Sequence, residues 1–528
     1  MKKNIIITIA LFSILIGCSD DFLERTPMDA VTIDNFYQTV EQIDAATALL
    51  YGWPWFTIND KAHWTIGDSR SGNDWTSDGQ MAQFFTFSVN SGNAQLGEAW
   101  TSLWMVVAHA NSIINNVPER ASSDIPAEVI KRAIGEAYFM RATAYFYLVR
   151  LWGGVPIIEN NSDLVFDSSV PRHRIEDVYT FMIMDLEKAT DALPPSYASA
   201  GRVTEWAAKG MLAKVYLAYS GYGQSGTRNQ QYLDRARELA GDVVNNSGLN
   251  LLPNYADLFK LAHNNNQESL FAMQWISCMD WGTQNTNQAY WAASGELTGA
   301  GDGWGGGKGP TIDLQREYEP SDLRRHATFM RDGDFYPELR RADGGYTHTI
   351  GQGSQIQAHI KKYVIGSAAD NGGAGSVCFM STGMNTYVLR LADVYLIYAE
   401  AVLGNSASTS DGGALNAFNA VRARAGLPAM SSITWEDIRR ERRIELAYEA
   451  DYWYDLVRWY YYDPQGAMAH INNQERGTYF WNEETEEHEV NSVNYTVTPN
   501  NFYLPFPQGD VDKNPLLLED PVPYNFNN

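Results

Sequence analysis

Aromatic side chains set among polar loop residues are the feature of this sequence best suited to binding a ligand. Sugar rings have apolar C–H faces and hydroxyl edges, so a sugar site combines flat aromatic surfaces with polar side chains at their margin. A loop aromatic more often anchors a minor core, but we expect at least one or two of these rings to form a ligand platform. The predicted contacts are Trp64, Asp68, Arg70, Asn73, Trp75, Trp281, Tyr290, Trp291 and Trp304. Trp75, within residues 72–79 (GNDWTSDG), is the strongest single candidate.

No sequence motif for catalysis accompanies these rings. Residues 301–309 are glycine-rich but lack the G-x-x-x-x-G-K-[ST] phosphate loop, and H-E-x-x-H, G-x-S-x-G and C-x-x-C do not occur. The stretch Asp74-x-Thr76-x-Asp78 begins like a calcium loop, but Phe85 occupies the position of the bidentate carboxylate. We therefore predict no enzyme activity, no cofactor and no metal ligands. A carboxylate pair for glycoside hydrolysis stays open, because any of 63 acidic residues could meet in space.

The amino-acid composition indicates a globular protein and argues against nucleic acid as its partner. The 528 residues are 45% hydrophobic and 19% charged, as in ordinary globular proteins. The formal net charge of −24 argues against a nucleic-acid partner, which requires clustered cations. Three cysteines exclude a disulfide framework, and whether Cys278 pairs with Cys378 stays open.

The N-terminus is typical of a bacterial lipoprotein. Lys2 and Lys3 precede an apolar run over 5–16 that is too short to span a bilayer. Residues 15–18 (LIGC) resemble a lipobox, so we predict a signal peptide over 1–17, lipidation of Cys18 and a tether over 18–27. The acidic residues that follow resemble a surface-export tag, which places the protein on the outer membrane facing the cell exterior. The alternative is a plain signal peptide with an incidental cysteine.

Apolar periodicity predicts a mainly α-helical fold. Helices are expected over 41–51, 98–117, 135–153, 173–193, 203–220, 231–246, 387–403, 411–425 and 435–460. Residues 52–97 and 261–386 lack this periodicity and are expected to be loop-rich. We predict one domain over 28–528, with a helical scaffold over 28–260 and 387–460, a ligand-binding insertion over 261–386, and a C-terminal tail over 461–528 that wraps the helices.

An internal repeat supports a helical-hairpin scaffold. The pattern A-x-[FV]-Y-L occurs at 144–148, 213–217 and 392–396. The first two copies start 69 residues apart, about twice the 34-residue period of a tetratricopeptide repeat. Small alanines let neighbouring helices approach closely, so the repeat predicts tetratricopeptide-like hairpins.

Residues 439–449 form a densely charged segment of the helix predicted over 435–460. Arg442 with Glu445, and Asp455 with Arg458, can pair at i, i+3 on one helix. We interpret this segment as a structural ion-pair network on a docked helix rather than as a ligand site.

Several ordered segments resemble the SusD/RagB family of outer-membrane nutrient-binding lipoproteins. They are the lipobox, 136–142 (EAYFMRA) with 151–156 (LWGGVP), 202–204 (RVT), 389–401 (LRLADVYLIYAEA), 441–446 (ERRIEL) through Trp453 to Arg458, 504–507 (LPFP) and 514–515 (NP). The tail departs from the family, whose members often end in Gln-Asn-Pro-Gly-Tyr where this chain has 518–524 (LEDPVPY).

This resemblance implies a SusD-like α–α superhelix with a ligand face built by inserted loops. It also implies a non-catalytic protein that captures oligosaccharides and delivers them to a SusC-like TonB-dependent transporter. Because ligand contacts vary between members, no site residue is carried over from the family. Two alternatives remain, namely a peptide-binding member of the family and a surface-tethered glycoside hydrolase.

Overall fold

The computed structural model describes residues 36–165, 168–350, 356, 358–482, 484–485 and 487–526. The predicted signal peptide, Cys18 and the tether lie outside these residues. Within the described part of the chain, no helix combines the length and the apolarity needed to cross a bilayer.

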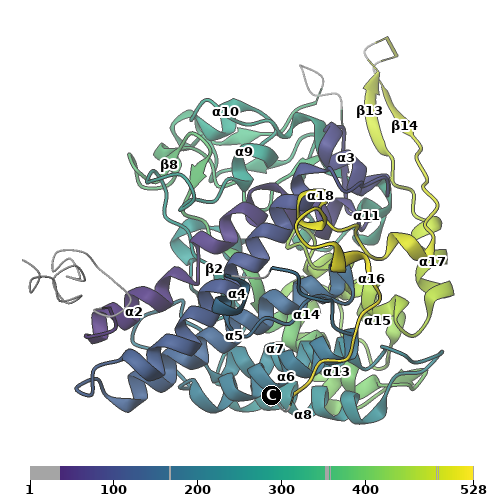
Figure 1. Ribbon diagram of the computed structural model, residues 1–528. Helices are drawn as coiled ribbons and strands as arrows, with labels where there is room; N and C mark the ends of the chain where they lie inside the picture. The colour runs from purple at the N-terminus through teal and green to yellow at the C-terminus, as the bar shows by residue number, and fades with distance from the viewer. Residues whose placement is uncertain are drawn as a thin grey trace, which may run out of the picture.

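The prediction of a mainly helical fold is confirmed. Consecutive helices pack against one another, from α4 to α8 and then on to α13 and α14 (Figure 1). The bounds are α2 (Val40–Leu49), α4 (Ala94–Arg120), α5 (Ala127–Trp152), α6 (Ile175–Ala192), α7 (Glu205–Tyr219), α8 (Gln230–Asn246), α13 (Leu391–Leu403) and α14 (Gly412–Arg424). Helix α13 follows a long excursion of the chain yet packs directly on α8, so the helical stack is continuous in space although not in sequence.

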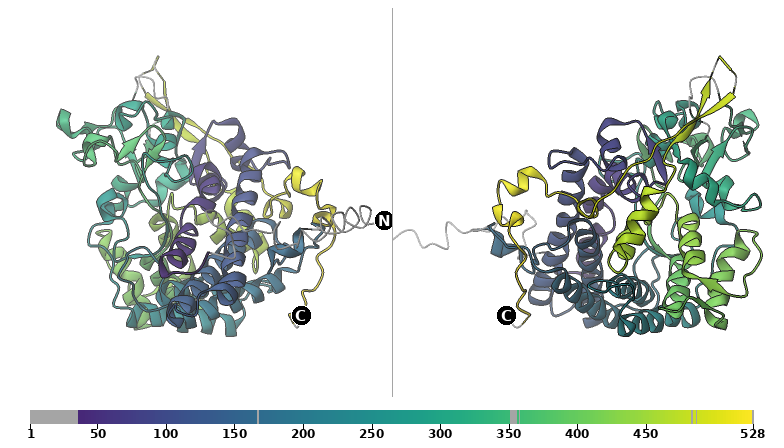
Figure 2. Two further views of the ribbon diagram at one scale, coloured as in Figure 1. Left: turned by 60° about the vertical axis from the view of Figure 1, so that its left-hand side comes forward. Right: turned by 90° about the vertical axis from the view of Figure 1, so that its right-hand side faces the viewer.

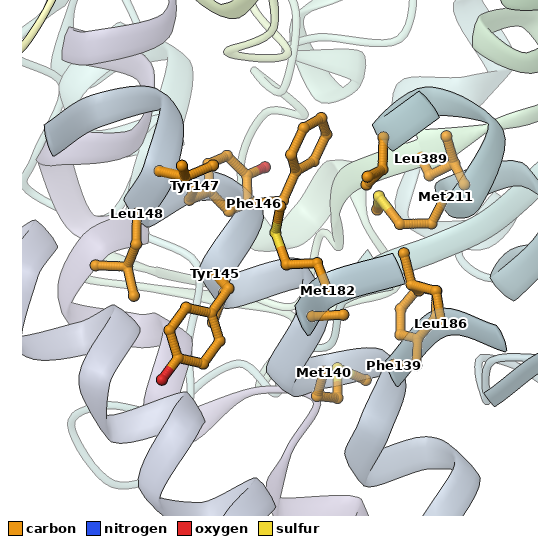
Figure 3. Packing of buried hydrophobic residues seen from close by; sticks show 14 of the residues in the cluster. Phe139, Met140, Tyr145, Phe146, Tyr147, Leu148, Met182, Leu186, Met211 and Leu389 are labelled. Atoms are coloured by element: carbon orange, nitrogen blue, oxygen red, sulfur yellow. The ribbon is translucent and has the colours of Figure 1, made fainter. Parts of the chain in front are cut away.

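Small and large apolar residues alternate in the core of this stack. The alanines that open the three repeat copies, Ala144, Ala213 and Ala392, are fully buried. Figure 3 shows large side chains of α5, α6, α7 and β10 (Thr386–Arg390) interdigitating in this core. Strand β10 pairs antiparallel with β2 (Ser269–Met273), so the excursion leaves and re-enters the scaffold at one place.

Between α8 and α13 the chain forms a loop-rich lobe with its own hydrophobic core. Trp291, Phe329 and Tyr363 belong to this core, which also includes Tyr448. Its elements are short: α9 (Asn287–Trp291), α10 (Gly295–Thr298), β3 (Lys308–Pro310), α11 (Ile312–Glu317), α12 (Arg324–Thr328), β4 (Phe329–Arg331), β5 (Phe335–Tyr336), β6 (Tyr346–Thr347), β7 (Ala358–Ile360), β8 (Val377–Cys378) and β9 (Ser381–Thr382). In Figure 1, α9, α10 and β8 of this lobe lie at the upper left, whereas α11 lies towards the right.

The predicted helix over 435–460 is wrong in one respect, because it is interrupted. Helix α15 (Trp435–Glu445) ends before α16 (Tyr452–Tyr460) begins, and Tyr448 and Ala450 between them have φ of 62° and 59°. The buried carboxylate of Asp68 accepts hydrogen bonds from the backbone N–H groups of both residues, at 2.8 and 2.9 Å. A distant side chain therefore compensates the helical hydrogen bonds lost at the break.

The expectation that residues 52–97 lack helix is also wrong. This segment contains the 3₁₀ turn η2 (Trp53–Trp55), the π-helices η3 (Ile58–Ala62) and η4 (Thr65–Ser69), and α3 (Gly79–Phe85). Trp55, Ile58 and Ile66 are fully buried. The wider turn of a π-helix changes the apolar spacing from the 3.6-residue period, which explains why the pattern was missed.

The charged segment forms a buried ion-pair network, as interpreted from the sequence. Asp455 pairs with Arg458 at 2.8 Å, as predicted. The predicted pair of Arg442 with Glu445 is wrong, because Arg442 bonds to Asp393, Asp451 and Asp455. Glu445 instead accepts from Arg324 and Arg390 at 2.9 and 2.6 Å, and also from Arg424.

The C-terminal residues run along the outside of the helices (Figure 2). The elements here are α17 (Pro464–Asn472), β13 (Thr478–Asn482), β14 (Glu487–Asn491) and α18 (Gln508–Val511). Backbone hydrogen bonds fix this segment, with Leu504 N bonded to Leu151 O at 2.7 Å and Val522 N to Arg172 O at 2.9 Å. The β13–β14 hairpin projects beside α3 at the top of Figure 1.

Candidate functional site

Four of the predicted contacts lie inside the protein. Trp64 is 2% exposed and packs edge-on against Trp291, with ring centroids 5.7 Å apart. Asp68, Arg70 and Asn73 are also buried. The cause is local, because the π-helical turns of η3 and η4 direct this segment into the interface between the scaffold and the loop-rich lobe. None of the four lines the cavity beside the exposed rings that is described below, so we do not retain them as contacts.

These buried polar groups hold the two parts of the fold together. Burial raises the pKa of the Asp68 carboxyl to about 7, although hydrogen bonds from Asn73, Tyr448 and Ala450 oppose that shift. Arg443 donates to the Oδ1 atom of Asn73 at 2.9 Å. The Arg70 guanidinium lies 4.6 Å from the centre of the Trp453 ring. Asp68 and Asn73 are hydrogen-bonded within this polar core, whereas Nε and Nη1 of Arg70 have no hydrogen-bond partner among the described residues.

Trp291 is likewise a core residue. It is 1% exposed, and its ring contacts Tyr363 and Tyr448 with centroid distances of 5.6 and 5.9 Å. It follows Tyr290 on the short helix α9, and both rings lie near Trp64 in the core of the loop-rich lobe. Only Tyr290 of this pair reaches a surface cavity.

Two of the remaining predicted rings stand at the surface, together with one that the sequence did not single out. Trp281 is 61% exposed, Trp304 is 46% exposed, and the additional ring, Phe379, is 56% exposed, whereas Tyr290 is 8% exposed and reaches solvent only through the cavity described below. The Trp304 ring contacts Tyr290 and Phe379, with centroids 5.7 and 5.8 Å away. We call Trp281, Tyr290, Trp304 and Phe379 the aromatic face.

Covalent and hydrogen bonds join the loops that carry this face. Cys278 and Cys378 form a disulfide, with Cα atoms 5.5 Å apart, which settles the question left open by the sequence. It links the loop of Trp281 to the loop of Phe379. The backbone N–H of Met380 donates to Asp302 at 2.5 Å, which joins the second loop to that of Trp304. The rings are therefore held on a cross-linked support rather than on free loops.

A cavity of about 530 Å³ opens beside Trp304. Its walls combine aromatic, apolar, cationic and hydrogen-bonding side chains. The lining residues are Lys61, Ser77, Asp78, Gln80, Met81, Gln95, Tyr290, Trp304, Gly307 and Lys308. Such a volume lies within the range of about 300–1,000 Å³ that is typical of small-ligand pockets. Concavity, flat rings and polar margins thus coincide at one place.

Trp75 lies next to this cavity but not inside it. It belongs to β1 (Asp74–Thr76), which pairs antiparallel with β3 so that Trp75 is opposite Gly309 and Thr76 opposite Lys308. Because side chains alternate along a strand, Trp75 points to the other side of this ribbon from Lys308. Its partly exposed ring packs edge-on against Phe480 of β13, with centroids 5.3 Å apart.

The structure adds polar residues that the sequence did not single out. Lys308 and Gln95 line the cavity from β3 and α4, over 200 positions apart in the chain. Their local sequences carry no signal for a binding site. Phe379 could have been noted, since it follows a cysteine in a polar loop.

Models of one protein family match most of the chain. The SusD family model matches residues 248–522, and a model described as starch-binding associating with outer membrane matches residues 21–217. A SusD-like protein of Bacteroides ovatus is 42% identical, with 100% of this chain and 99% of that protein aligned. SusD-like protein P2 of Formosa agariphila is 27% identical, with 87% of this chain and 91% of that protein aligned.

Solved structures, among them that of a SusD-like protein, also resemble this chain. A protein crystallised with a xylogluco-oligosaccharide is 43% identical to this chain, with a TM-score of 0.86 over 92% of this chain and 100% of that one. A laminarin binding SusD-like protein is 23% identical and shares the fold, with a TM-score of 0.67 over 90% of this chain and 98% of that one. The chain therefore belongs to the SusD family of carbohydrate-binding, non-catalytic proteins.

Proposed function

We propose that this protein captures an oligosaccharide on the aromatic face and delivers it to a SusC-like TonB-dependent transporter. The observation that carries the proposal is the exposed rings of Trp281, Trp304 and Phe379, whose loops are cross-linked, beside a polar-lined cavity. The xylogluco-oligosaccharide bound by a 43% identical protein supports a glycan as the ligand. Trp281, Trp304, Tyr290 and Trp75 remain the predicted contacts, with Phe379 added.

Binding would combine stacking with hydrogen bonds at the ring edges. Trp281 and Trp304 offer flat apolar surfaces to the C–H faces of sugar rings, and each aromatic contact contributes on the order of 1 kcal/mol. Polar side chains at the margin then fix the orientation of the hydroxyl groups. Single-site affinity can stay modest, because a transporter held beside the binding protein raises the effective concentration of the bound glycan.

The membrane anchor is a second part of the proposal. Lipidation of Cys18 would hold the body at the outer membrane on the cell exterior, and the family model matching 21–217 is described as associating with that membrane. Several acyl chains on one cysteine provide stable attachment. Replacing Cys18 by Ala should release the protein from the membrane fraction, whereas retention of the variant in that fraction would contradict lipid anchoring.

Calorimetry with a panel of glycans and peptides tests the binding function. The mature protein should bind at least one oligosaccharide, and Trp304→Ala and Trp281→Ala should each weaken that binding by about tenfold or more. Phe335→Ala is the matched control, because Phe335 is an aromatic residue of similar exposure that lies on β5. Preference for peptides, or undiminished glycan binding by both tryptophan variants, would contradict the proposal.

A further inference from the structure

We infer that the cavity beside Trp304 holds a single neutral sugar residue that branches from the main chain of the bound glycan. This inference rests on the proposed function and makes it narrower, because it assigns the protein to branched rather than linear glycans. Lys308 and Gln95 are the residues that would select the branch.

Lys308 carries the first part of the argument. It lines the cavity and is 6% exposed, and among the described residues its ammonium makes no hydrogen bond and no direct ion pair, although the nearby side chains of Asp74 and Asp78 favour its charged form. Its nearest aromatic neighbour is the Trp64 ring, whose centre is 5.9 Å away. A buried ammonium whose hydrogen bonds are unmade is costly, so a ligand oxygen at this position would recover those hydrogen bonds.

Gln95 carries the second part from another element. It lies in the first turn of α4 and is 5% exposed, and its Oε1 atom has no hydrogen-bond partner among the described residues. Gln95 lines the same cavity as Lys308. The ammonium of Lys308 and the Oε1 atom of Gln95 thus line the same cavity, and neither makes a hydrogen bond to the described residues.

The mixture of groups favours a neutral sugar over an acidic one. Lys61 and Lys308 donate hydrogen bonds, whereas Gln95 and Asp78 accept them. A hydroxyl-bearing ring uses both kinds of partner at once. A carboxylate would need donors alone and would meet the Asp78 carboxylate in the same cavity.

The position of the cavity favours a branch over the main chain. Trp304 belongs both to the exposed face, through Phe379, and to the cavity, through Tyr290. A main chain stacked on Trp304 and Phe379 would run past the mouth of the cavity. A residue attached to the side of that chain could then enter between Tyr290 and Lys308.

The test compares two ligands that share a β-glucan main chain. A xylogluco-oligosaccharide carries single xylose branches, and a cello-oligosaccharide of equal main-chain length carries none. Calorimetry should show about tenfold tighter binding of the branched ligand by the wild-type protein, as expected for one or two added hydrogen bonds. Lys308→Met should remove most of this preference and leave binding of the linear ligand within twofold.

Two further variants complete the experiment. Gln95→Leu tests the same cavity from α4 and keeps the inference falsifiable if Lys308→Met does not fold. Lys131→Met is the matched control, because Lys131 is an exposed lysine on α5. Equal binding of both ligands by the wild type, or equal weakening of both by the cavity variants, would overturn the inference and leave the proposed function intact. If the wild-type protein binds neither ligand, both the choice of a β-glucan main chain and the inference are wrong. If glycan binding is unchanged in Trp304→Ala, the proposed aromatic face itself is contradicted.

Discussion

The disulfide between Cys278 and Cys378 joins two loops that each end in an exposed ring. Trp281 lies three residues after the first cysteine, and Phe379 directly follows the second. Phe379 contacts Trp304, whose own loop is bonded to the second loop through Asp302. The spacing of the exposed rings is therefore set by bonds between loops, and not by any one loop alone.

Removing this disulfide should weaken both stability and glycan binding. In Cys278→Ser/Cys378→Ser, a closed loop of about 100 residues is released, which lowers the free energy of unfolding by about 2–5 kcal/mol. Affinity should also fall by several-fold, because Trp281 and Phe379 lose their fixed spacing. Urea unfolding and calorimetry at a temperature where the variant is folded measure the two effects. Unchanged affinity would show that the hydrogen bond from Cys278 N to Ser381 Oγ suffices to hold the face.

Asp68 should prove structural rather than ligand-binding. In Asp68, Oδ1 accepts from the backbone N–H of Tyr448 and Oδ2 from that of Ala450, so Asp68→Asn replaces one of these two acceptors by an amide NH₂ group. We expect the free energy of unfolding to fall by about 1–3 kcal/mol, the usual cost of leaving a buried donor unsatisfied. Glycan affinity of the folded variant should equal that of the wild type. A loss of affinity without a loss of stability would return Asp68 to the site.

The helical scaffold could be predicted because its signal is local. In α5 and α7, apolar residues recur at helical spacing and a glycine follows close after the last turn, so the sequence around each helix suffices. The break between α15 and α16 could not be predicted in this way. It depends on Asp68, 380 positions away, which accepts the backbone hydrogen bonds of Tyr448.

The ligand site was predicted only in part, for a related reason. Polar neighbours suggest that a tryptophan lies in a loop, but they do not show which way its ring points. Trp64 and Trp304 have similar polar surroundings in the sequence, yet one is buried by π-helical turns and the other is exposed. Gln95 and Lys308 become a pair only when α4 and β3 meet in space.

The pH dependence of stability should reveal a protonated carboxyl group on β1, that of Asp74. Burial raises the pKa of Asp74 to about 8 from an ordinary value of 3.8. The folded protein then holds a proton that the unfolded chain has released, so this group's contribution is lost as the pH rises towards 8. Asp74→Asn removes that dependence. Its melting temperature relative to wild type should rise between pH 6 and pH 9, whereas parallel curves would contradict the assignment.

The ion-pair network should respond most strongly to the loss of Glu445. This fully buried carboxylate accepts hydrogen bonds from Arg324, Arg390 and Arg424, and these three cations hold its pKa well below the usual range. Glu445→Gln keeps the shape but leaves the guanidinium groups short of one negative charge, at a cost of about 3–5 kcal/mol.

Urea unfolding of Glu445→Gln beside Glu296→Gln provides the matched comparison. Glu296 also pairs with an arginine, Arg340, at 2.9 Å, but its side chain is 69% exposed. Because water screens such a pair, the control should cost less than about 1 kcal/mol. If both variants lost the same small amount, the network would not be what joins α15 to the loop-rich lobe. A large loss confined to Glu445→Gln would instead show that the buried group of ion pairs gives this charged helix its structural role.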